Sequence, residues 1–178
     1  MATPLRLDFE DDPHKSSEVA VRPSFEAATS APRPPSQPKI ETEKDLVTFT
    51  DARGNLHVID RTEVVAMYSK PDSLDIWLGQ AFLTIELANS KDVATEIQEG
   101  WSGRLKLNLP NSHYYFAFRG VVTIYHRENV IEVIVASAEN ARIIMTTTTA
   151  EVAGTTVRQM SQHWQAYKQR QARSQTGR

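Results

Sequence analysis

The sequence predicts an α+β fold in which two tandem units, each of five strands and one helix, pack as one compact β-rich body. Three observations support this prediction. Most of residues 46–146 fall into short runs of alternating apolar and polar side chains, with turn residues between the runs. Segments 89–101 and 148–167 instead show helical spacing. The apolar residues of "VVTIYHRENVIEVIV" at 121–135 also match those of "VVAMYSKPDSLDIWL" at 64–78.

The first predicted unit covers residues 45–101. "LVTFTD" and "LHVID" alternate on either side of "ARGN", where Gly54 can take a positive φ, so they predict a hairpin. "EVVAMYS", "SLDIWLG" and "FLTIELA" predict three further strands. In "NSKDVATEIQEGW" an apolar residue then recurs at every fourth position, which predicts a helix capped by Asn89 or Ser90.

The second predicted unit covers residues 102–168 and repeats this order. "RLKLNL", "HYYFAF", "VVTIYH", "VIEVIVA" and "RIIMTT" predict five strands. Thr148 and Glu151 match a capping box, which predicts the start of a helix. We expect "EGWSGR" to be a short hinge in which Trp101 fills the seam between the units. The apolar stripe of the predicted C-terminal helix consists of Ala153, Val157, Met160, Trp164 and Tyr167.

The two ends of the chain differ from this middle part. Seven of the nine prolines precede Ile40, so we expect residues 1–44 to be a disordered or extended arm. Residues 169–178 form a basic tail without acidic residues. A unit of this size is marginal alone, and we therefore expect the two units to pack against each other. The alternative architecture is a PH-like barrel closed by its C-terminal helix.

Composition excludes several classes of protein. A formal net charge of -2 argues against a strongly basic nucleic-acid binder. The chain has no Cys, which excludes disulfides, thiolate zinc sites and a cysteine nucleophile. No apolar run approaches the roughly 20 residues of a membrane span, and the N-terminus lacks a secretory signal pattern. We therefore expect a cytoplasmic protein with no membrane partner.

The sequence shows no pattern that predicts catalysis. Gly-rich phosphate loops and the nucleophile elbow are absent from it. No catalytic residue, cofactor or metal ligand is predicted, although an enzyme with a site between the two units stays as a third hypothesis. The histidines do not pair at the spacing of a helical zinc site; they are His14, His57, His113, His126 and His163.

The predicted C-terminal helix is longer than its counterpart and ends in bases. Such a surplus suits contact with an acidic protein or a phosphate backbone. The partner-binding residues predicted there are Trp164, Tyr167, Lys168, Arg170 and Arg173.

The aromatic strand "HYYFAF" has two interpretations. Tyr114 and Phe116 on one face, with Arg119 nearby, could stack single-stranded bases. A sheet covered on both faces, or a subunit interface, explains the same strand without nucleic acid, and we prefer that interpretation.

The N-terminal arm contains an apolar island. In "PLRLDFEDD", Leu5, Leu7 and Phe9 alternate and then meet an acidic cluster, as in short docking peptides. The stretch resembles the bacterial sliding-clamp docking peptide, whose pattern is Gln, Leu, any residue, Leu, any residue, Phe. Pro4 stands where that pattern has Gln. The resemblance implies docking onto a clamp, whereas the island itself suggests docking onto some protein or onto a second copy.

These observations lead to two main hypotheses. The first is a non-catalytic assembly, adaptor or structural protein that binds protein partners or itself, such as a component of a phage virion. The second is an accessory factor of nucleic-acid metabolism that binds single-stranded DNA or RNA.

Overall fold

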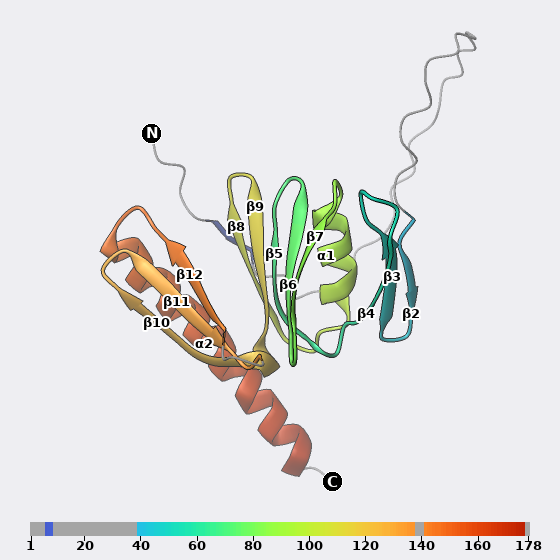
Figure 1. The fold of residues 1–178 in the computed structure, drawn as a ribbon. Coiled ribbons are helices and arrows are strands. Elements are labelled where there is room, and N and C mark those ends of the chain that lie inside the picture. Colours follow the sequence, from blue (N-terminus) through green and yellow to red (C-terminus); the bar gives the residue numbers. More distant parts are fainter. Residues whose placement is uncertain (1–5, 9–38, 138–140, 177–178) are drawn as a thin grey trace, which may run out of the picture.

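The computed structural model describes residues 6–8, 39–137 and 141–176 (Figure 1). Their elements, in chain order, are β1 (Arg6–Asp8), β2 (Glu41–Glu43), β3 (Leu46–Thr50), β4 (Leu56–Asp60), β5 (Val64–Ser69), β6 (Ser73–Leu78), β7 (Phe82–Glu86), α1 (Ser90–Glu99), β8 (Arg104–Leu109), β9 (Ser112–Ala117), the 3-10 helix η1 (Phe118–Gly120), β10 (Val121–Arg127), β11 (Val130–Val135), β12 (Arg142–Thr146) and α2 (Ala150–Thr176).

The strands form three open sheets in which every paired neighbour is antiparallel. The largest has the strand order β1-β8-β9-β5-β6-β7, and the others are β10-β11-β12 and β2-β3-β4. The six-stranded sheet stands between the two smaller ones (Figure 1). The protein is therefore a β-rich α+β protein. The described strands do not close a barrel, so the PH-like alternative is not the architecture they form.

Five strands and a helix follow one another twice along the chain. β3 to β7 precede α1, and β8 to β12 precede α2. The two parts share the largest sheet, because β9 pairs with β5. In that pair Tyr114 lies opposite Tyr68, and Phe116 lies opposite Ala66. A continuous sheet, in addition to the hinge, therefore connects the two parts.

The hairpins β5-β6 and β10-β11 have the same register. Val64 lies opposite Leu78, and a register shift follows between residues 64 and 66. Val121, 57 positions after Val64, lies opposite Val135, and the same shift follows between residues 121 and 123. We call two residues related in this way equivalent positions.

Backbone hydrogen bonds outside the ladders repeat as well. The amide of Gly79 donates to the carbonyl of Glu63 at 3.1 Å, and the equivalent amide of Ala136 donates to Gly120 at 2.8 Å. Two further pairs of backbone bonds correspond once the loop between β11 and β12, which is three residues longer than the loop between β6 and β7, is taken into account. The amide of Leu78 donates to Ala81 as that of Val135 donates to Ala141, and the amide of Leu87 donates to Asp72 as that of Thr147 donates to Asn129. The sequence match at 64–78 and 121–135 is thus accompanied by matched backbone geometry.

Two hydrophobic cores lie on opposite faces of the six-stranded sheet. Met67 and Tyr115 point into the first core, which α1 covers, whereas Ala66 and Phe116 point into the second. Corresponding strand positions fill both cores. In the first they are Val47, Phe49, Leu74, Ile76 and Ile85; in the second they are Leu105, Leu107, Ile131, Val133 and Met145.

The helix ends differ in detail from the sequence prediction. Trp101 lies just beyond α1, where it fills the first core and its Nε1 donates to the carbonyl of Arg61 at 3.0 Å. Asn89 precedes α1 but makes no side-chain cap, and the hydroxyl of Ser90 bonds the carbonyl of Lys70 instead. The predicted cap of α2 at Thr148 is wrong by one residue. Thr149 caps α2, because its Oγ1 accepts from the amide of Val152 at 3.2 Å.

Two short strands lie inside the predicted N-terminal arm. β2 pairs with β3, and β1 pairs with β8 across a long stretch of chain. Residues 1–5 and 9–38 lie outside the described residues. Neither α1 nor α2, the α-helices of the described ranges, has the length and apolar composition that crossing a membrane requires.

Candidate protein-interaction surfaces

The strands that join the two parts of the molecule are buried. Every residue of β5 except Tyr68 is buried, and so are the last three residues of β9. Side chains of β5 and β9 cross between the two parts. Val65 of the first part packs in the second core, and Tyr115 of the second part packs in the first core. Each core therefore takes side chains from the other part.

The equivalent strands at the ends of the molecule are exposed. β10 is equivalent to β5, and Val122, the equivalent of Val65, is 51% exposed. β4 is equivalent to β9, and Val58, the equivalent of Tyr115, is 56% exposed. Among the described strands, β10 pairs only with β11 and β4 only with β3, so each has one outer edge without a paired strand, although α2 packs against β10. Exposed apolar side chains beside an unpaired edge are typical of an interaction surface.

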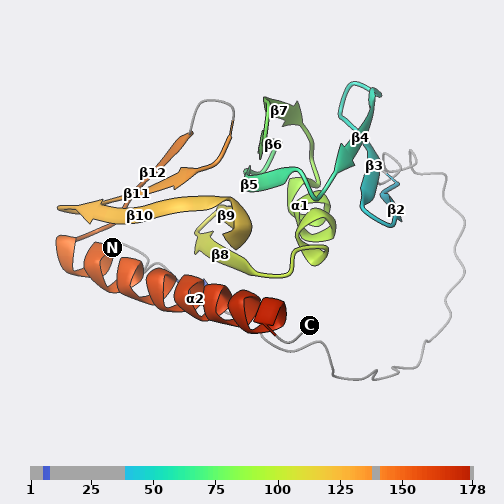
Figure 2. The ribbon, with the colours of Figure 1, turned by 90° about the horizontal axis from the view of Figure 1, so that it is seen from below.

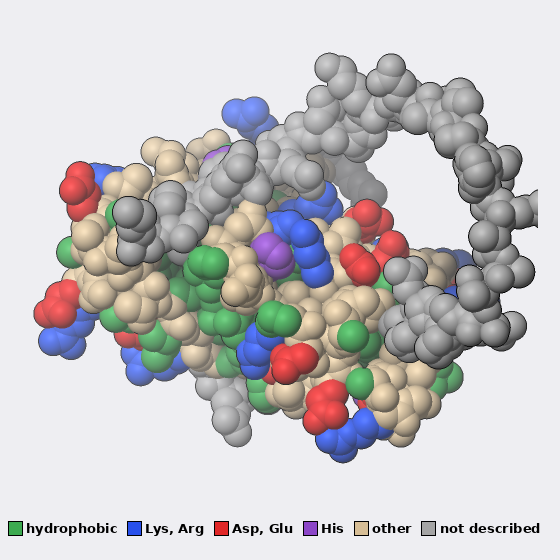
Figure 3. All heavy atoms as spheres, turned by 90° about the horizontal axis from the view of Figure 1, so that it is seen from above, with side chains coloured by type: hydrophobic (Ala, Val, Ile, Leu, Met, Phe, Trp, Pro, Cys, Tyr) green, Lys and Arg blue, Asp and Glu red, His purple; other side chains and the backbone are tan. Residues whose placement is uncertain are grey.

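The outward face of the β2-β3-β4 sheet extends this surface. Leu46, Leu56 and Val58 alternate with inward-facing residues along β3 and β4, and all three are exposed. None of the three is among the partner-binding residues predicted from the sequence, although "LHVID" carries apolar residues on both of its faces and so signals that both faces are covered. From above, apolar side chains form small groups among scattered charged ones (Figure 3).

A groove separates β4 from the edge of the six-stranded sheet. It has a volume of about 330 Å³ and is lined mainly by apolar residues of β4, β6 and β7, including Val58, Leu78 and Leu83. Its lining offers two carboxylates, Asp60 and Glu63, and no basic side chain. β4 and β7 both line the groove and do not pair with each other, so the outer edge of β4 has no paired strand.

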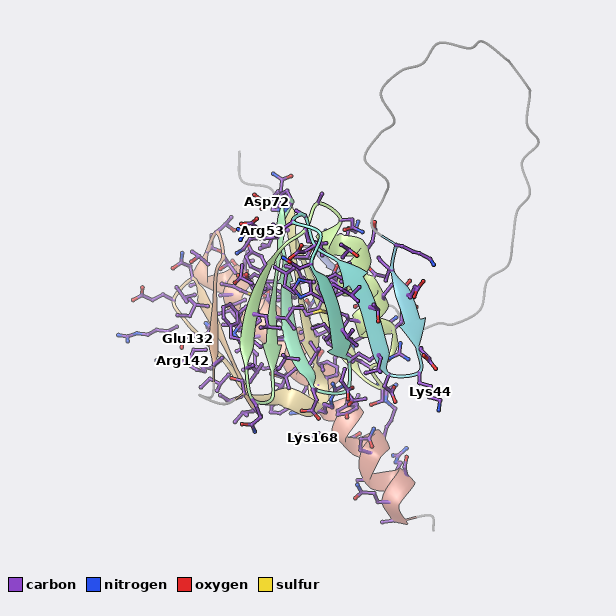
Figure 4. All side chains as sticks on the ribbon, turned by 45° about the vertical axis from the view of Figure 1, so that its right-hand side comes forward. Lys44, Arg53, Asp72, Glu132, Arg142 and Lys168 are labelled. Atoms are coloured by element: carbon purple, nitrogen blue, oxygen red, sulfur yellow. The ribbon has the colours of Figure 1, made fainter. Side chains whose placement is uncertain are left out.

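The far end of α2 projects beyond the sheets (Figure 1), whereas its first turns lie alongside β10 (Figure 2). Residues 168–176 are all exposed. Lys168 lies with its Nζ 4.5 Å from the ring centre of Trp164, at the point where the helix leaves the body (Figure 4). Arg170 and Arg173 follow on the projecting turns. The basic residues predicted as partner-binding are therefore placed on one exposed segment.

The two aromatic residues predicted with them serve a different role. Tyr167 is buried, and its ring lies 5.7 Å from that of Phe118. It also covers Gly103, where a Cβ would collide with the Tyr167 ring. Trp164 is half-buried against the second core. Both residues hold α2 to its own chain.

The three residues predicted as a nucleic-acid face do not form one exposed platform. Tyr114 is half-buried and stacks on Tyr68, with ring centres 4.1 Å apart. Burial, with Tyr68 as a second cause, raises the pKa of Tyr114 to about 12. Phe116 is 0% exposed, so it has no surface on which a base could stack. Arg119 donates to the carbonyls of Arg61 and Thr62, which precede β5, and of Val64, the first residue of β5.

The N-terminal island is placed in part. Leu7 belongs to β1 and lies opposite Leu107 of β8. Leu5 and Phe9 lie outside the described residues. The backbone of residues 6–8 thus adds a strand to a sheet edge, which is one of the ways in which docking peptides bind.

A polar hollow of about 370 Å³ lies at the start of α1. Ser69 and Ser90 bond each other through their hydroxyls at 2.8 Å within its lining. Lys70, also in the lining, is paired with Asp75 at 2.7 Å. Across the described residues, no three His, Asp or Glu side chains converge as a metal site would require. The lining also contains Lys91, Asp92 and His113, so the hollow offers both polar and charged contacts.

A charged cluster occupies the outer side of the β10-β11-β12 sheet. Arg142 lies 2.8 Å from Glu132 and donates to the hydroxyl of Tyr125 at 2.8 Å (Figure 4). Tyr125 in turn donates to Glu132. Since Tyr125 belongs to β10, the cluster fixes a half-buried aromatic residue beside the unpaired edge.

Comparisons with known proteins give no match for this chain, whether with protein-family models, with curated proteins or with solved structures.

Proposed function

We propose that this chain is a non-catalytic assembly protein, built from a duplicated unit, whose partners are proteins. The duplication is supported by the shared register, the shared bulge and the repeated backbone hydrogen bonds of β5-β6 and β10-β11. A duplicated β-rich unit is a scaffold, and its function lies in the surfaces it presents.

One observation carries the proposal. Both outer ends of the molecule expose large apolar residues on strands: Leu46, Leu56 and Val58 at one end, and Val122 and Ile144 at the other. Single exposed apolar residues are ordinary, but apolar residues gathered beside unpaired strand edges favour pairing with another chain. Contact with protein would remove these side chains from water.

The projecting end of α2 is a second surface for the same role. Lys168, Arg170 and Arg173 give it a positive charge that suits an acidic protein surface. The N-terminal arm, which contains Leu5, Leu7 and Phe9, is a further candidate for contacts with partners. A homo-oligomeric particle, such as a phage virion, or an intracellular adaptor complex would use both.

Light scattering during size exclusion tests the proposal. The full chain has a mass of 20.0 kDa, and we expect a larger species whose fraction rises with protein concentration. A chain ending at Tyr167 is the control for folding, because residues 168–176 are exposed and their removal leaves both cores intact. If the full chain remains a single 20.0-kDa species at every concentration, self-assembly is excluded.

The alternative function is binding of single-stranded nucleic acid by the end of α2. It is supported by residues 168–178, which contain four bases and no acids. Binding of this kind weakens steeply with salt, because cations released from the phosphates return at high salt. Titration of labelled single-stranded DNA at two salt concentrations therefore tests it. An affinity that is absent or independent of salt rules this alternative out.

A further inference from the structure

We propose that copies of this chain join head to tail, with β4 of one copy paired to β10 of the next in the register that β9 uses on β5. This inference rests on the proposed assembly function and names its partner, a second copy. The predicted antiparallel pairs are Ile59 with Thr123, Val58 with Ile124, and His57 with Tyr125.

The equivalence of the strands supplies the register. β10 corresponds to β5, because Val121 and Val64 begin hairpins with the same bulge. β4 corresponds to β9, because Asp60 and Ala117 end their hairpins 57 positions apart, opposite Leu46 and Arg104 respectively. The chain already contains the contact between β9 of the second unit and β5 of the first. Within the described residues, β4 of the first unit and β10 of the second remain without that contact.

Burial shows which surfaces lack a partner. β5 is almost wholly buried where β9 covers it, whereas β10 exposes Val122, His126 and Arg127. The end of β9 is buried where β5 and α1 cover it, whereas β4 exposes Leu56 and Val58. The exposed positions are the ones that a repeated junction would cover.

The apolar side chains would then enter existing cores. Tyr115 packs in the first core below α1, so its equivalent Val58 would pack below α2 of the neighbouring copy. Val65 packs in the second core, so its equivalent Val122 would pack in the first core of the neighbour. Burying these side chains stabilises the contact through the hydrophobic effect.

An aromatic pair would also repeat. Within the chain, Tyr68 of β5 stacks on Tyr114 of β9 with ring centres 4.1 Å apart. The equivalent residues are Tyr125 of β10 and His57 of β4. His57 is already held by Asp51, with its Nε2 3.0 Å from Oδ2, and Tyr125 by Glu132. Both rings are thus oriented before the second copy arrives.

One position departs from the repeat. Val65 packs on Gly120, but the first unit has Glu63 at the equivalent position. In the proposed contact the side chain of Glu63 must turn away from Val122 of the neighbour, and it has room to do so because Glu63 is exposed. Because different surfaces meet in this contact, repetition gives either an open chain of copies or a closed ring.

Disulfide trapping tests the register directly, since the natural chain has no Cys. Opposed residues of neighbouring antiparallel strands are close enough for a disulfide. We expect a tagged Val58→Cys chain mixed with an Ile124→Cys chain to form a covalent pair under mild oxidation. The matched control is Val58→Cys mixed with Ile144→Cys, since Ile144 is exposed on β12, a strand outside the proposed contact. Equal cross-linking in both mixtures overturns the proposed register.

Charge substitution provides a second readout. We expect Val58→Lys and Val122→Lys each to convert the assembled species into single chains of 20.0 kDa. The melting temperature should not change, because both side chains are half-exposed. Ile144→Lys should still assemble. Assembly that survives both lysine variants overturns the β4-β10 contact but leaves the proposed assembly function standing. An unmodified chain that never exceeds 20.0 kDa overturns this inference and excludes self-assembly, but it leaves contact with other proteins standing.

Discussion

Val65 occupies the space that a side chain at Gly120 would need. A Cβ on Gly120 would lie 2.5 Å from the Cβ of Val65, closer than real contacts allow. Val65 belongs to the first unit and Gly120 precedes β10, so this contact fixes the seam between the units. We expect Gly120→Ala to destabilise the protein by about 1–3 kcal/mol, because either the backbone or Val65 must move.

A urea unfolding curve measures the effect of Gly120→Ala. Gly79→Ala is the matched control, because its Cβ would meet only the exposed carboxylate of Glu63, at 3.2 Å, which can turn aside. We expect the control to change stability by no more than about 0.5 kcal/mol. Equal unfolding midpoints for the two variants would show that the seam is not tightly packed at Gly120.

Arg119 holds the start of β5 in place. Its guanidinium donates to the carbonyls of Thr62 at 2.6 Å and Val64 at 2.7 Å, and Arg119→Met would leave these acceptors without it. We expect a loss of about 2–3 kcal/mol in the free energy of unfolding, as for charged hydrogen bonds. Arg53→Met is the control, because its pair with Glu86 is exposed and so contributes little to stability. A smaller loss for Arg119→Met than for Arg53→Met would refute this role.

Asp51 contributes to the stability of the folded protein, and this contribution is lost in acid. Hydrogen bonds from His57 and Asn55 hold the pKa of its carboxyl below the usual range. A carboxyl whose folded pKa is lowered contributes stability above its unfolded pKa, near 4, and that contribution is lost as pH falls below about 4. We expect the difference in unfolding free energy between the natural chain and Asp51→Asn to shrink from pH 6 to pH 2.5. A constant difference over that range would contradict the prediction.

Tyr114 lowers the stability of the folded protein as pH rises, whereas Asp51 does so as pH falls. Burial, followed by the influence of Tyr68, raises its pKa to about 12. The folded state therefore disfavours the phenolate, and stability should fall as pH rises above the unfolded pKa of about 10. We expect Tyr114→Phe to lose less stability than the natural chain between pH 10 and pH 12, measured by urea unfolding. Parallel losses in the two proteins would exclude this role for Tyr114.

The local elements follow from the sequence because alternation and turn residues act over short distances. Gly54 has a φ of 87° in the turn where a positive φ was predicted. Val93 and Ile97 lie on the buried face of α1, as their spacing predicts. Trp101 continues that spacing but lies beyond the helix, because Gly100 ends it. Periodicity alone does not show where a helix stops.

The pairing of distant strands does not follow from the sequence. Nothing in "HYYFAF" indicates that Tyr115 enters one core and Phe116 the other, although an aromatic residue on each face indicates that both faces are covered. Arg119 is predicted beside a nucleic-acid face because it is a base near the aromatic strand. Its backbone acceptors, Arg61 among them, are far away in the chain, so the sequence does not reveal them. The exposure of Val58 and Val122 can be recognised only from the fold, since the sequences of their strands resemble those of buried strands.

The pairing of β9 with β5 also governs the order in which the chain can fold during synthesis. The first core contains Tyr115 and Ala117, which emerge from the ribosome only after the whole of the first unit. β1, synthesised first, finds its partner β8 only about a hundred residues later. The β5 edge of the first unit therefore stays unpaired until β9 has been synthesised. During that interval the nascent chain exposes the same kind of edge that the finished protein keeps at β10.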